Sequence, residues 1–201
     1  QNKPLLLSTG MASKDEIDDA VKVAKKYGSG ELLLFHCISD YPAATEESNI
    51  NLIRTLKNKY EIEVGLSDHT LNNTAALAAV SLGAVAIEKH FIKSRKNKGP
   101  DSFFSIEPSE LKELKLSTKQ CWKALGSGDF ERTASENKNT VFRRSLYFVE
   151  DMKSGDVITS NHVKRLRPGY GIPPKFLKQI INKKVKKSIK RGDRVTWECI
   201  E

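Results

Sequence analysis

Short apolar runs alternate with amphipathic segments over the first 125 residues of the chain. In residues 13–28 the apolar side chains Ile17, Val21 and Ala24 recur at helical spacing, and Gly28 follows as a stop signal. Further helices are expected at 46–60, 70–83 and 109–126, and strands at 4–9, 32–37, 61–69 and 84–91. This alternation predicts βα units around a parallel sheet that is covered on both faces.

Polar residues follow each of the four apolar runs. They are Ser8 and Thr9, then His36 and Cys37, then Ser67, Asp68 and His69, and finally Glu88, Lys89 and His90. Active sites of parallel barrels collect at the carboxyl ends of several strands. A doubly wound sheet is the alternative, but the chain lacks a glycine-rich dinucleotide fingerprint. The sequence therefore favours half of an eight-stranded α/β barrel.

The composition changes after the fourth helix. Residues 127–140 are polar and lack apolar periodicity, as expected of a linker. The near-repeats at 152–159 and 189–196 each place a Gly-Asp turn before apolar residues, which is typical of a β-rich module. We therefore predict a barrel part at 1–130, a linker at 131–141 and a small β-rich domain at 142–201.

All the excess positive charge lies in the C-terminal third. Residues 1–135 carry 18 basic and 18 acidic side chains, whereas residues 136–201 carry 16 and 7, a net charge of +9. Nucleic-acid binding is one reading of such a basic tail. Aromatic residues are not interleaved with the basic ones as stacking platforms, so we expect no nucleic-acid partner. A solvated basic face, or one that helps to hold an anionic small molecule, remains.

Three cysteines, Cys37, Cys121 and Cys199, are far apart and form no CxxC pair. This pattern predicts neither a disulfide framework nor a zinc site and favours a reducing, cytoplasmic setting. No run approaches the roughly 18 apolar residues of a membrane span, and no signal-peptide pattern opens the chain. We expect no membrane partner. The chain begins inside an apolar run without methionine, as expected of a piece of a longer protein.

The two histidines that end the third and fourth runs are candidate metal ligands. His69 and His90 on adjacent strand ends could share one divalent ion and leave positions open for substrate. A hydrogen-bonded histidine pair is equally compatible with the pattern. Asp68 and Glu88 could accept hydrogen bonds behind the histidines, although Asp68 could instead cap the next helix. Asp101 could join the site or simply hold a Pro-Asp turn.

Taken together, these strings resemble the sialic acid synthase family. The resemblance is carried by LSTGMAS (7–13), Tyr41-Pro42 with Asn49, GLSDHT (65–70), SLGAVAIEKHF (81–91), GPD followed by SxEPxEL (99–111), KALG (123–126), RRS (143–145), MKSGDVIT (152–159) and RLRPGYGIPP (165–174). It implies the second half, strands five to eight, of a TIM (β/α)8 barrel followed by a β-rich antifreeze-like (SAF, β-clip) domain. The first four strands, which in the family supply phosphoenolpyruvate-binding lysines and a catalytic glutamate, are missing.

The resemblance also implies a reaction: phosphoenolpyruvate condenses with an N-acetylated amino-sugar aldehyde to a nine-carbon 2-keto sugar acid and phosphate, for cell-surface glycans. A divalent ion, Mn²⁺ or Mg²⁺, would act as Lewis acid. Carried over by motif, His69 and His90 match the catalytic metal ligands, Ser8 and Ser67 match phosphoenolpyruvate-binding serines, and Tyr41 and Asp101 match sugar contacts. Ser39 stands where some members have asparagine. Arg167 matches an arginine that reaches across a domain-swapped homodimer to the N-acetyl group.

Three segments resemble pseudaminic acid synthases more than N-acetylneuraminate or legionaminate synthases. They are residues 99–108, 142–151 and 167–177, with Ser102 where other branches commonly have histidine. We therefore expect a 2,4-diacetamido-2,4,6-trideoxy sugar, whose methyl group could face Phe103 and Phe104 unless these only pack a loop. Because half the substrate site is absent, we expect the chain alone to be inactive. A non-catalytic binding fragment is the alternative.

Overall fold

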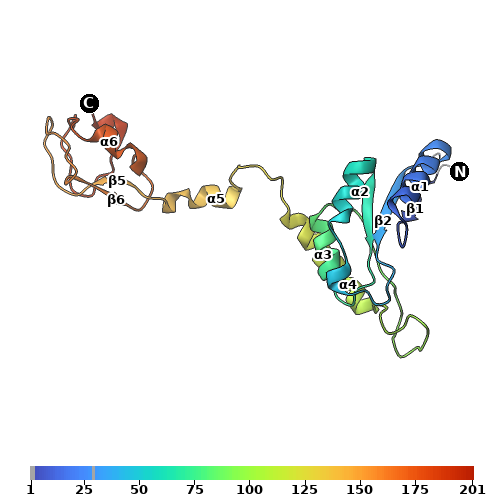
Figure 1. Ribbon diagram of the computed structural model, residues 1–201. Coiled ribbons are helices and arrows are strands. Elements are labelled where there is room, and N and C mark those ends of the chain that lie inside the picture. The colour runs from blue at the N-terminus through green and yellow to red at the C-terminus, as the bar shows by residue number, and fades with distance from the viewer. Residues whose placement is uncertain (1–2, 29) are drawn as a thin grey trace. The chain divides into compact units, whose positions relative to one another are not determined.

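Two compact units divide the protein, one ending at Gly128 and the other formed by Asp129–Glu201 (Figure 1). The computed structural model describes residues 3–28 and 30–201. No helix in these described ranges is both long enough and apolar enough to cross a bilayer. We call the first the N-terminal unit and the second the C-terminal unit.

The N-terminal unit is a parallel sheet with a helix after each strand (Figure 1). The strands pair in sequence order, and every described pairing is parallel, as predicted. The strands are β1 (Leu5–Ser8), β2 (Leu32–Cys37), β3 (Glu63–Ser67) and β4 (Ile87–Glu88). The helices are α1 (Lys14–Tyr27), α2 (Leu52–Tyr60), α3 (Thr74–Ser81) and α4 (Pro108–Ala124), with a short 3-10 turn at Thr45–Glu47.

Alternation along the strands separates the core from the opposite face of the sheet. Leu34, Val64 and Leu66 pack with Ile17 and Ile53 from the helices. Side chains one position away in β2 and β3 therefore face the other side. On that side the Phe35 ring covers Gly65, where an added Cβ would lie 2.7 Å from the ring. The face away from the helices is thus left for residues such as Cys37 and Ser67.

The largest differences from the predicted bounds concern two helices and one strand, which are much shorter in the structure. The helix expected at 46–60 begins only at Leu52, because Asn49 takes a left-handed conformation with φ of 42° that a helix does not admit. The helix expected at 70–83 begins at Thr74, after the side chains of Asp68 and Asn72 have accepted backbone N–H groups. The strand expected at 84–91 is limited to Ile87–Glu88.

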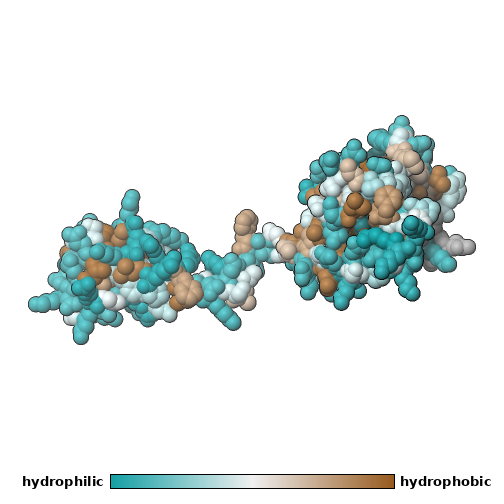
Figure 2. Space-filling view, turned by 90° about the horizontal axis from the view of Figure 1, so that it is seen from below, coloured by the Kyte–Doolittle hydropathy of each residue, from teal (hydrophilic) through white to brown (hydrophobic). Residues whose placement is uncertain are grey.

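Apolar side chains are exposed along both described edges of the N-terminal unit. Leu6 on β1 is 57% exposed, and Val85 beside β4 and Trp122 on α4 are 58% and 66% exposed. Hydrophobic residues are visible among polar ones on the larger body in Figure 2. Four consecutive parallel βα units with apolar edges agree with the predicted half-barrel.

The C-terminal unit contains an antiparallel pair of strands, β5 (Ser145–Phe148) and β6 (Val163–Leu166). The helices are α5 (Ala134–Asn139) and α6 (Leu177–Ile180), with 3-10 turns at Thr140–Phe142, Pro174–Phe176 and Trp197–Cys199. The segment interpreted as an aperiodic linker therefore includes α5. A capping box explains it, because the Thr133 hydroxyl accepts from Glu136 N while the Glu136 carboxylate accepts from Thr133 N.

The two near-repeats of the C-terminal unit pack against each other as related halves. Met152 and Ile189 exchange backbone hydrogen bonds of 3.0 and 2.8 Å, and each occupies the same place in its repeat. The predicted Gly-Asp turns are present, with φ of 92° at Gly155 and 97° at Gly192. The β-rich prediction is therefore confirmed. The unit has its own core, which includes Leu146, Phe148, Ile158, Ile180, Val185 and Val195.

Candidate active site

The two predicted metal-binding histidines lie side by side in the N-terminal unit. His69 follows β3 and His90 follows β4, so the parallel pairing of these strands brings both side chains to one edge of the sheet. Their ring centroids are 5.1 Å apart, with the ring planes at 69°. The expected proximity is therefore confirmed, whereas the role of the two rings as metal ligands stays a prediction.

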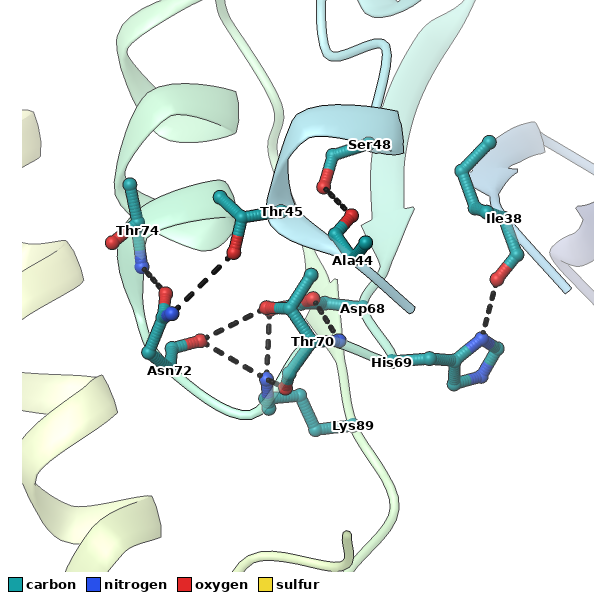
Figure 3. Close-up of polar contacts among 10 residues, drawn as sticks. All are labelled: Ile38, Ala44, Thr45, Ser48, Asp68, His69, Thr70, Asn72, Thr74 and Lys89. Atoms are coloured by element: carbon teal, nitrogen blue, oxygen red, sulfur yellow. Dashed lines mark hydrogen bonds and ion pairs between the residues drawn. The ribbon is translucent and has the colours of Figure 1, made fainter. Parts of the chain in front are cut away.

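Each imidazole has an oxygen atom close to Nδ1. His69 Nδ1 lies 2.8 Å from the carbonyl oxygen of Ile38, a distance at which Nδ1–H donates and the lone pair is left on Nε2 (Figure 3). His90 Nδ1 lies 3.4 Å from Asp101 Oδ2. Carbonyl and carboxylate partners of this kind orient metal-binding histidines and fix their tautomer.

The two acidic residues expected behind the histidines have other partners. The Asp68 carboxylate accepts from Lys89 Nζ and from Thr70 N, at 2.8 and 2.9 Å. Glu88 accepts from the Ser67 hydroxyl at 2.7 Å. The alternative that Asp68 caps the next helix is also wrong, because it is the side chain of Asn72 that accepts from Thr74 N at the start of α3.

A divalent ion fits the donor set, but only with two protein ligands. Among the residues that the structure describes, no group of three or more His, Cys, Asp or Glu side chains converges on one point. A metal held by Nε2 of His69 and of His90 would therefore keep several coordination positions for substrate and water, as catalytic sites require.

Aromatic rings enclose the histidine pair. The Tyr41 ring lies 4.3 Å from that of His69 and 5.7 Å from that of His90, between centroids. Phe104 is buried and lies 4.8 Å from the His90 ring, whereas Phe103 is 62% exposed and its ring lies 5.2 Å from that of Phe104. The structure thus places Tyr41 in the site and separates the two phenylalanines that the sequence could not distinguish.

Asp101 takes part both in the site and in a turn. Its carbonyl oxygen accepts from the backbone N–H and the hydroxyl of Ser105, at 3.1 and 2.7 Å, which holds the loop after β4. Its carboxylate faces His90. The two interpretations of this residue are therefore compatible, since the turn presents the side chain to the histidine.

Two of the three serines predicted to bind substrate, Ser8 and Ser39, converge on a glycine. A Cβ added to Gly10 would lie 2.5 Å from Ser39 Oγ and 3.6 Å from Ser8 Oγ, so both hydroxyls border the space that Gly10 leaves open. Ser67 lies in β3 opposite Glu88 of β4 in the register and donates its hydroxyl proton to that carboxylate.

Arg167 lies in the C-terminal unit, directly after β6, and is exposed. Within the described ranges it has no ion pair with an acidic residue. The next residue, Pro168, accepts two hydrogen bonds at its carbonyl oxygen, from Ser145 Oγ at 2.8 Å and from Tyr147 OH at 3.0 Å. The side chain is thus free of its own unit and its loop is fixed, which is compatible with the predicted contact with a partner subunit.

Sequence reasoning missed the Ile38 carbonyl that orients His69, and no sequence signal could have revealed it, because every residue carries a carbonyl. It also missed Gly10, although a glycine placed directly after Ser8 and Thr9 is a detectable sign of close packing.

Known proteins are similar to this chain over nearly its whole length. A family model described as the NeuB family matches residues 1–130, and one described as the SAF domain matches residues 143–201. Together with the parallel sheet and the separate antiparallel pair, these matches confirm the predicted fold class, the second half of a TIM barrel followed by a β-rich SAF domain.

Individual relatives agree with this assignment. Pseudaminic acid synthase of Campylobacter jejuni is 39% identical over 193 residues, which cover 96% of this chain and 56% of the relative. N,N'-diacetyllegionaminic acid synthase of the same species is 38% identical over 197 residues, covering 96% and 59%. A solved N-acetylneuraminic acid synthetase of Leptospira borgpetersenii, in complex with citrate, is 42% identical, with a TM-score of 0.62 over 67% of this chain and 47% of that one. The chain therefore spans somewhat more than half the length of these curated relatives.

Proposed function

From the premise that the chain belongs to the NeuB family and carries an SAF domain, we propose that it forms part of a nonulosonic acid synthase. Completed by the barrel strands that it does not contain, this enzyme condenses phosphoenolpyruvate with an N-acetylated amino-sugar aldehyde in the cytoplasm. The products are a nine-carbon 2-keto sugar acid for cell-surface glycans, and phosphate. The chain alone is inactive, because half of the substrate site lies outside it.

One observation carries the proposal: two imidazoles, 5.1 Å apart at the carboxyl ends of adjacent parallel strands, each with an oxygen atom near Nδ1. Mn²⁺ or Mg²⁺ bound to Nε2 of His69 and His90 would supply a Lewis acid for the aldehyde oxygen of the sugar. C3 of phosphoenolpyruvate then bonds to the aldehyde carbon, water adds at C2, and phosphate leaves.

The remaining site residues bind and orient the two substrates. Tyr41 and Asp101 lie against the histidine pair and contact the sugar. Ser8, which borders the space at Gly10, and Ser67 bind phosphoenolpyruvate, and Ser39 on the same space is a further substrate contact. In a domain-swapped homodimer the exposed Arg167 grips the N-acetyl group in the barrel of the partner subunit.

We propose a 2,4-diacetamido-2,4,6-trideoxy sugar as substrate, so that the product is pseudaminic acid. The support is the similarity to pseudaminic acid synthases and the buried Phe104, which offers an apolar wall beside His90. A methyl-binding wall rejects a hydroxyl only modestly, on the order of a hundredfold, so weak turnover of N-acetylmannosamine is expected.

The test is phosphate release by the complete protein with phosphoenolpyruvate and each of three sugars: the pseudaminate, legionaminate and N-acetylneuraminate precursors. Chelator and His69→Ala should each lower the rate at least about a thousandfold, as loss of several kcal/mol of transition-state stabilisation requires. His162→Ala, in the C-terminal unit, is the matched control. Preference for N-acetylmannosamine would overturn the choice of sugar, and full activity in chelator would overturn the metal.

A further inference from the structure

A buried ion pair lies directly behind the two histidines. Asp68 precedes His69 and Lys89 precedes His90, and Lys89 Nζ lies 2.8 Å from Asp68 Oδ2 (Figure 3). The side chains of Lys89 and Asp68 are only 3% and 1% exposed. The imidazole of His69 points away from this pair, toward Ile38. The ion pair and the imidazole of His69 thus occupy opposite sides of the same stretch of backbone.

The polar groups of this pair are satisfied by the loop that follows β3. Lys89 Nζ donates to the carbonyl oxygens of Thr70 and Asn72 at 2.6 and 3.3 Å, so its three protons meet three acceptors. The second oxygen of Asp68 accepts from Thr70 N at 2.9 Å. The Asn72 side chain in turn accepts from Thr74 N, where α3 begins. The lysine thereby ties the end of β4 to the β3–α3 loop.

Backbone pairing between the two strands stops where this ion pair begins. The β3–β4 register ends at Ser67 opposite Glu88, and the last backbone bond joins Asp68 N to the Glu88 carbonyl at 2.8 Å. The backbone carbonyls of His69 and His90 accept from different loops, from Ala43 N at 3.0 Å and from Ile106 N at 2.8 Å. The Asp68–Lys89 pair therefore continues the link between the two chains at the positions next to the histidines.

Stability alone is a poor reason for such a pair. Desolvating two charges offsets most of their attraction, so replacing a buried ion pair by apolar residues is often neutral or stabilising. A role in fixing the positions of the adjacent histidines accounts for this ion pair better than a gain in stability does. We propose that Asp68 and Lys89 are positioning residues that hold His69 and His90 at the separation needed for a shared metal ion. That the histidines share a metal ion rests on the proposed function, whereas the claim that the ion pair fixes their positions does not.

The test uses the 201-residue chain and the double variant Asp68→Asn with Lys89→Met, which leaves no unpaired buried charge. The first readout is the imidazole nitrogen NMR spectrum, in which wild-type His69 should show a proton fixed on Nδ1. The second is Mn²⁺ affinity, measured by electron paramagnetic resonance. We expect the double variant to lose the fixed tautomer and to bind Mn²⁺ at least about tenfold more weakly. Loss of the residues that support metal-binding histidines typically has an effect of this size.

Two controls separate positioning from general destabilisation. Ile53→Val removes a buried methylene group from the core side of α2 and should lower the unfolding temperature without changing either readout. Lys57→Met combined with Glu63→Gln removes an exposed ion pair and matches the loss of one positive and one negative charge. Should the double variant not fold, Lys89→Arg replaces it, because a planar guanidinium keeps the charge but does not reproduce three bonds from one nitrogen.

The outcomes separate the inference from the proposed function. A variant that keeps the wild-type tautomer and Mn²⁺ affinity overturns the positioning role. The positioning role is also overturned if Ile53→Val loses as much stability as the double variant and shifts both readouts equally far. Absence of Mn²⁺ binding by the wild-type chain counts against the metal in the proposed function, while the imidazole spectrum still decides whether the pair positions His69.

Discussion

Histidine residues of this chain differ in environment more than the sequence suggests. His36 ends an apolar run just as His69 and His90 do, yet its side chain turns to the helix side of the sheet. It is 1% exposed, with Nε2 2.8 Å from the Ser48 carbonyl oxygen, and Nδ1 is buried without a hydrogen-bond partner among the described residues. Strand periodicity explains the difference, because neighbouring positions in a strand face opposite sides.

Burial of His36 makes the stability of the N-terminal unit depend on pH. Burial lowers the pKa of His36 below its ordinary value, and the bond to Ser48 offsets this only in part. The unfolded chain therefore binds a proton at a higher pH than the folded one. The contribution of neutral His36 to the free energy of unfolding is therefore present above the ordinary histidine pKa of about 6.5. It is lost as the pH falls toward the lowered pKa of His36 in the folded chain, and the loss at pH 5.5 is at most about 1.4 kcal/mol.

The measurement is urea unfolding at pH 7.5 and 5.5, followed by Trp122 in a Trp197→Phe background. His36→Gln should be less stable than wild type at pH 7.5 and should lose less stability on acidification. His162→Gln is the control for a partly exposed histidine in the other unit. Equal pH dependence in wild type and His36→Gln would show that another group titrates.

Sequence reasoning predicted which residues meet in the site better than it predicted their partners. His69 and His90 were brought together correctly, because parallel strands end at one edge of a sheet whatever their side chains. The prediction that Asp68 accepts a hydrogen bond from a histidine was wrong. A residue next to a histidine in a strand points to the opposite face of the sheet, and on that face Asp68 pairs with Lys89. Oxygen partners supplied by the backbone, such as Ile38, carry no sequence signal at all.

Among the elements, the boundaries that failed were set by the local conformation and contacts of single residues. The α1 helix agrees with the prediction from the spacing of Ile17, Val21 and Ala24, and a capping box between Ser13 and Glu16 fixes its start in the structure. The start of α2 was missed because the left-handed conformation of Asn49 overrides the helical spacing around it. The short β4 was missed because the chain leaves the sheet after Glu88 to supply Lys89 and His90 to their separate contacts.

The paired repeats of the C-terminal unit differ where the Arg167 loop is attached. Ser145 and Tyr147, just before the first repeat, correspond in position to Asn182 and Lys184, just before the second. Ser145 and Tyr147 both donate to the Pro168 carbonyl oxygen, and the Ser145 hydroxyl also accepts from Gly171 N at 2.9 Å. Neither Asn182 nor Lys184 carries the same hydroxyl group, so these hydrogen bonds are specific to the strand before the first repeat.

We therefore expect Tyr147→Phe to loosen that loop. The variant removes one hydrogen bond to the Pro168 carbonyl oxygen and should lower the free energy of unfolding of the C-terminal unit by about 1 kcal/mol. Urea unfolding followed by Trp197 measures the loss, and amide exchange at Gly169 and Gly171 should accelerate. Tyr27→Phe, at an exposed tyrosine of the N-terminal unit, is the matched control. Unchanged exchange would mean that Ser145 alone fixes the loop.

At the scale of the whole molecule, the two units are unequally complete. The core of the C-terminal unit draws only on its own residues and includes Leu146, Phe148 and Val195 at 0% exposure. The N-terminal unit leaves apolar surface open at both described edges of its sheet, where a closed barrel would continue. The boundary between the two units could be predicted from the change from a helical to a turn-rich sequence pattern. The helix α5, which lies between the two patterns, was not predicted.

This difference predicts that residues 129–201 fold on their own. Expressed separately, they should unfold cooperatively, and their midpoint should agree within about 4 °C with the transition that Trp197 reports in the intact chain, because 1 kcal/mol shifts a domain of this size by about 4–8 °C. The N-terminal unit, followed by Trp122, should unfold at lower temperature and bind a hydrophobic dye through its apolar edges. A fragment without a cooperative transition would show that the C-terminal unit depends on contacts with the rest of the chain.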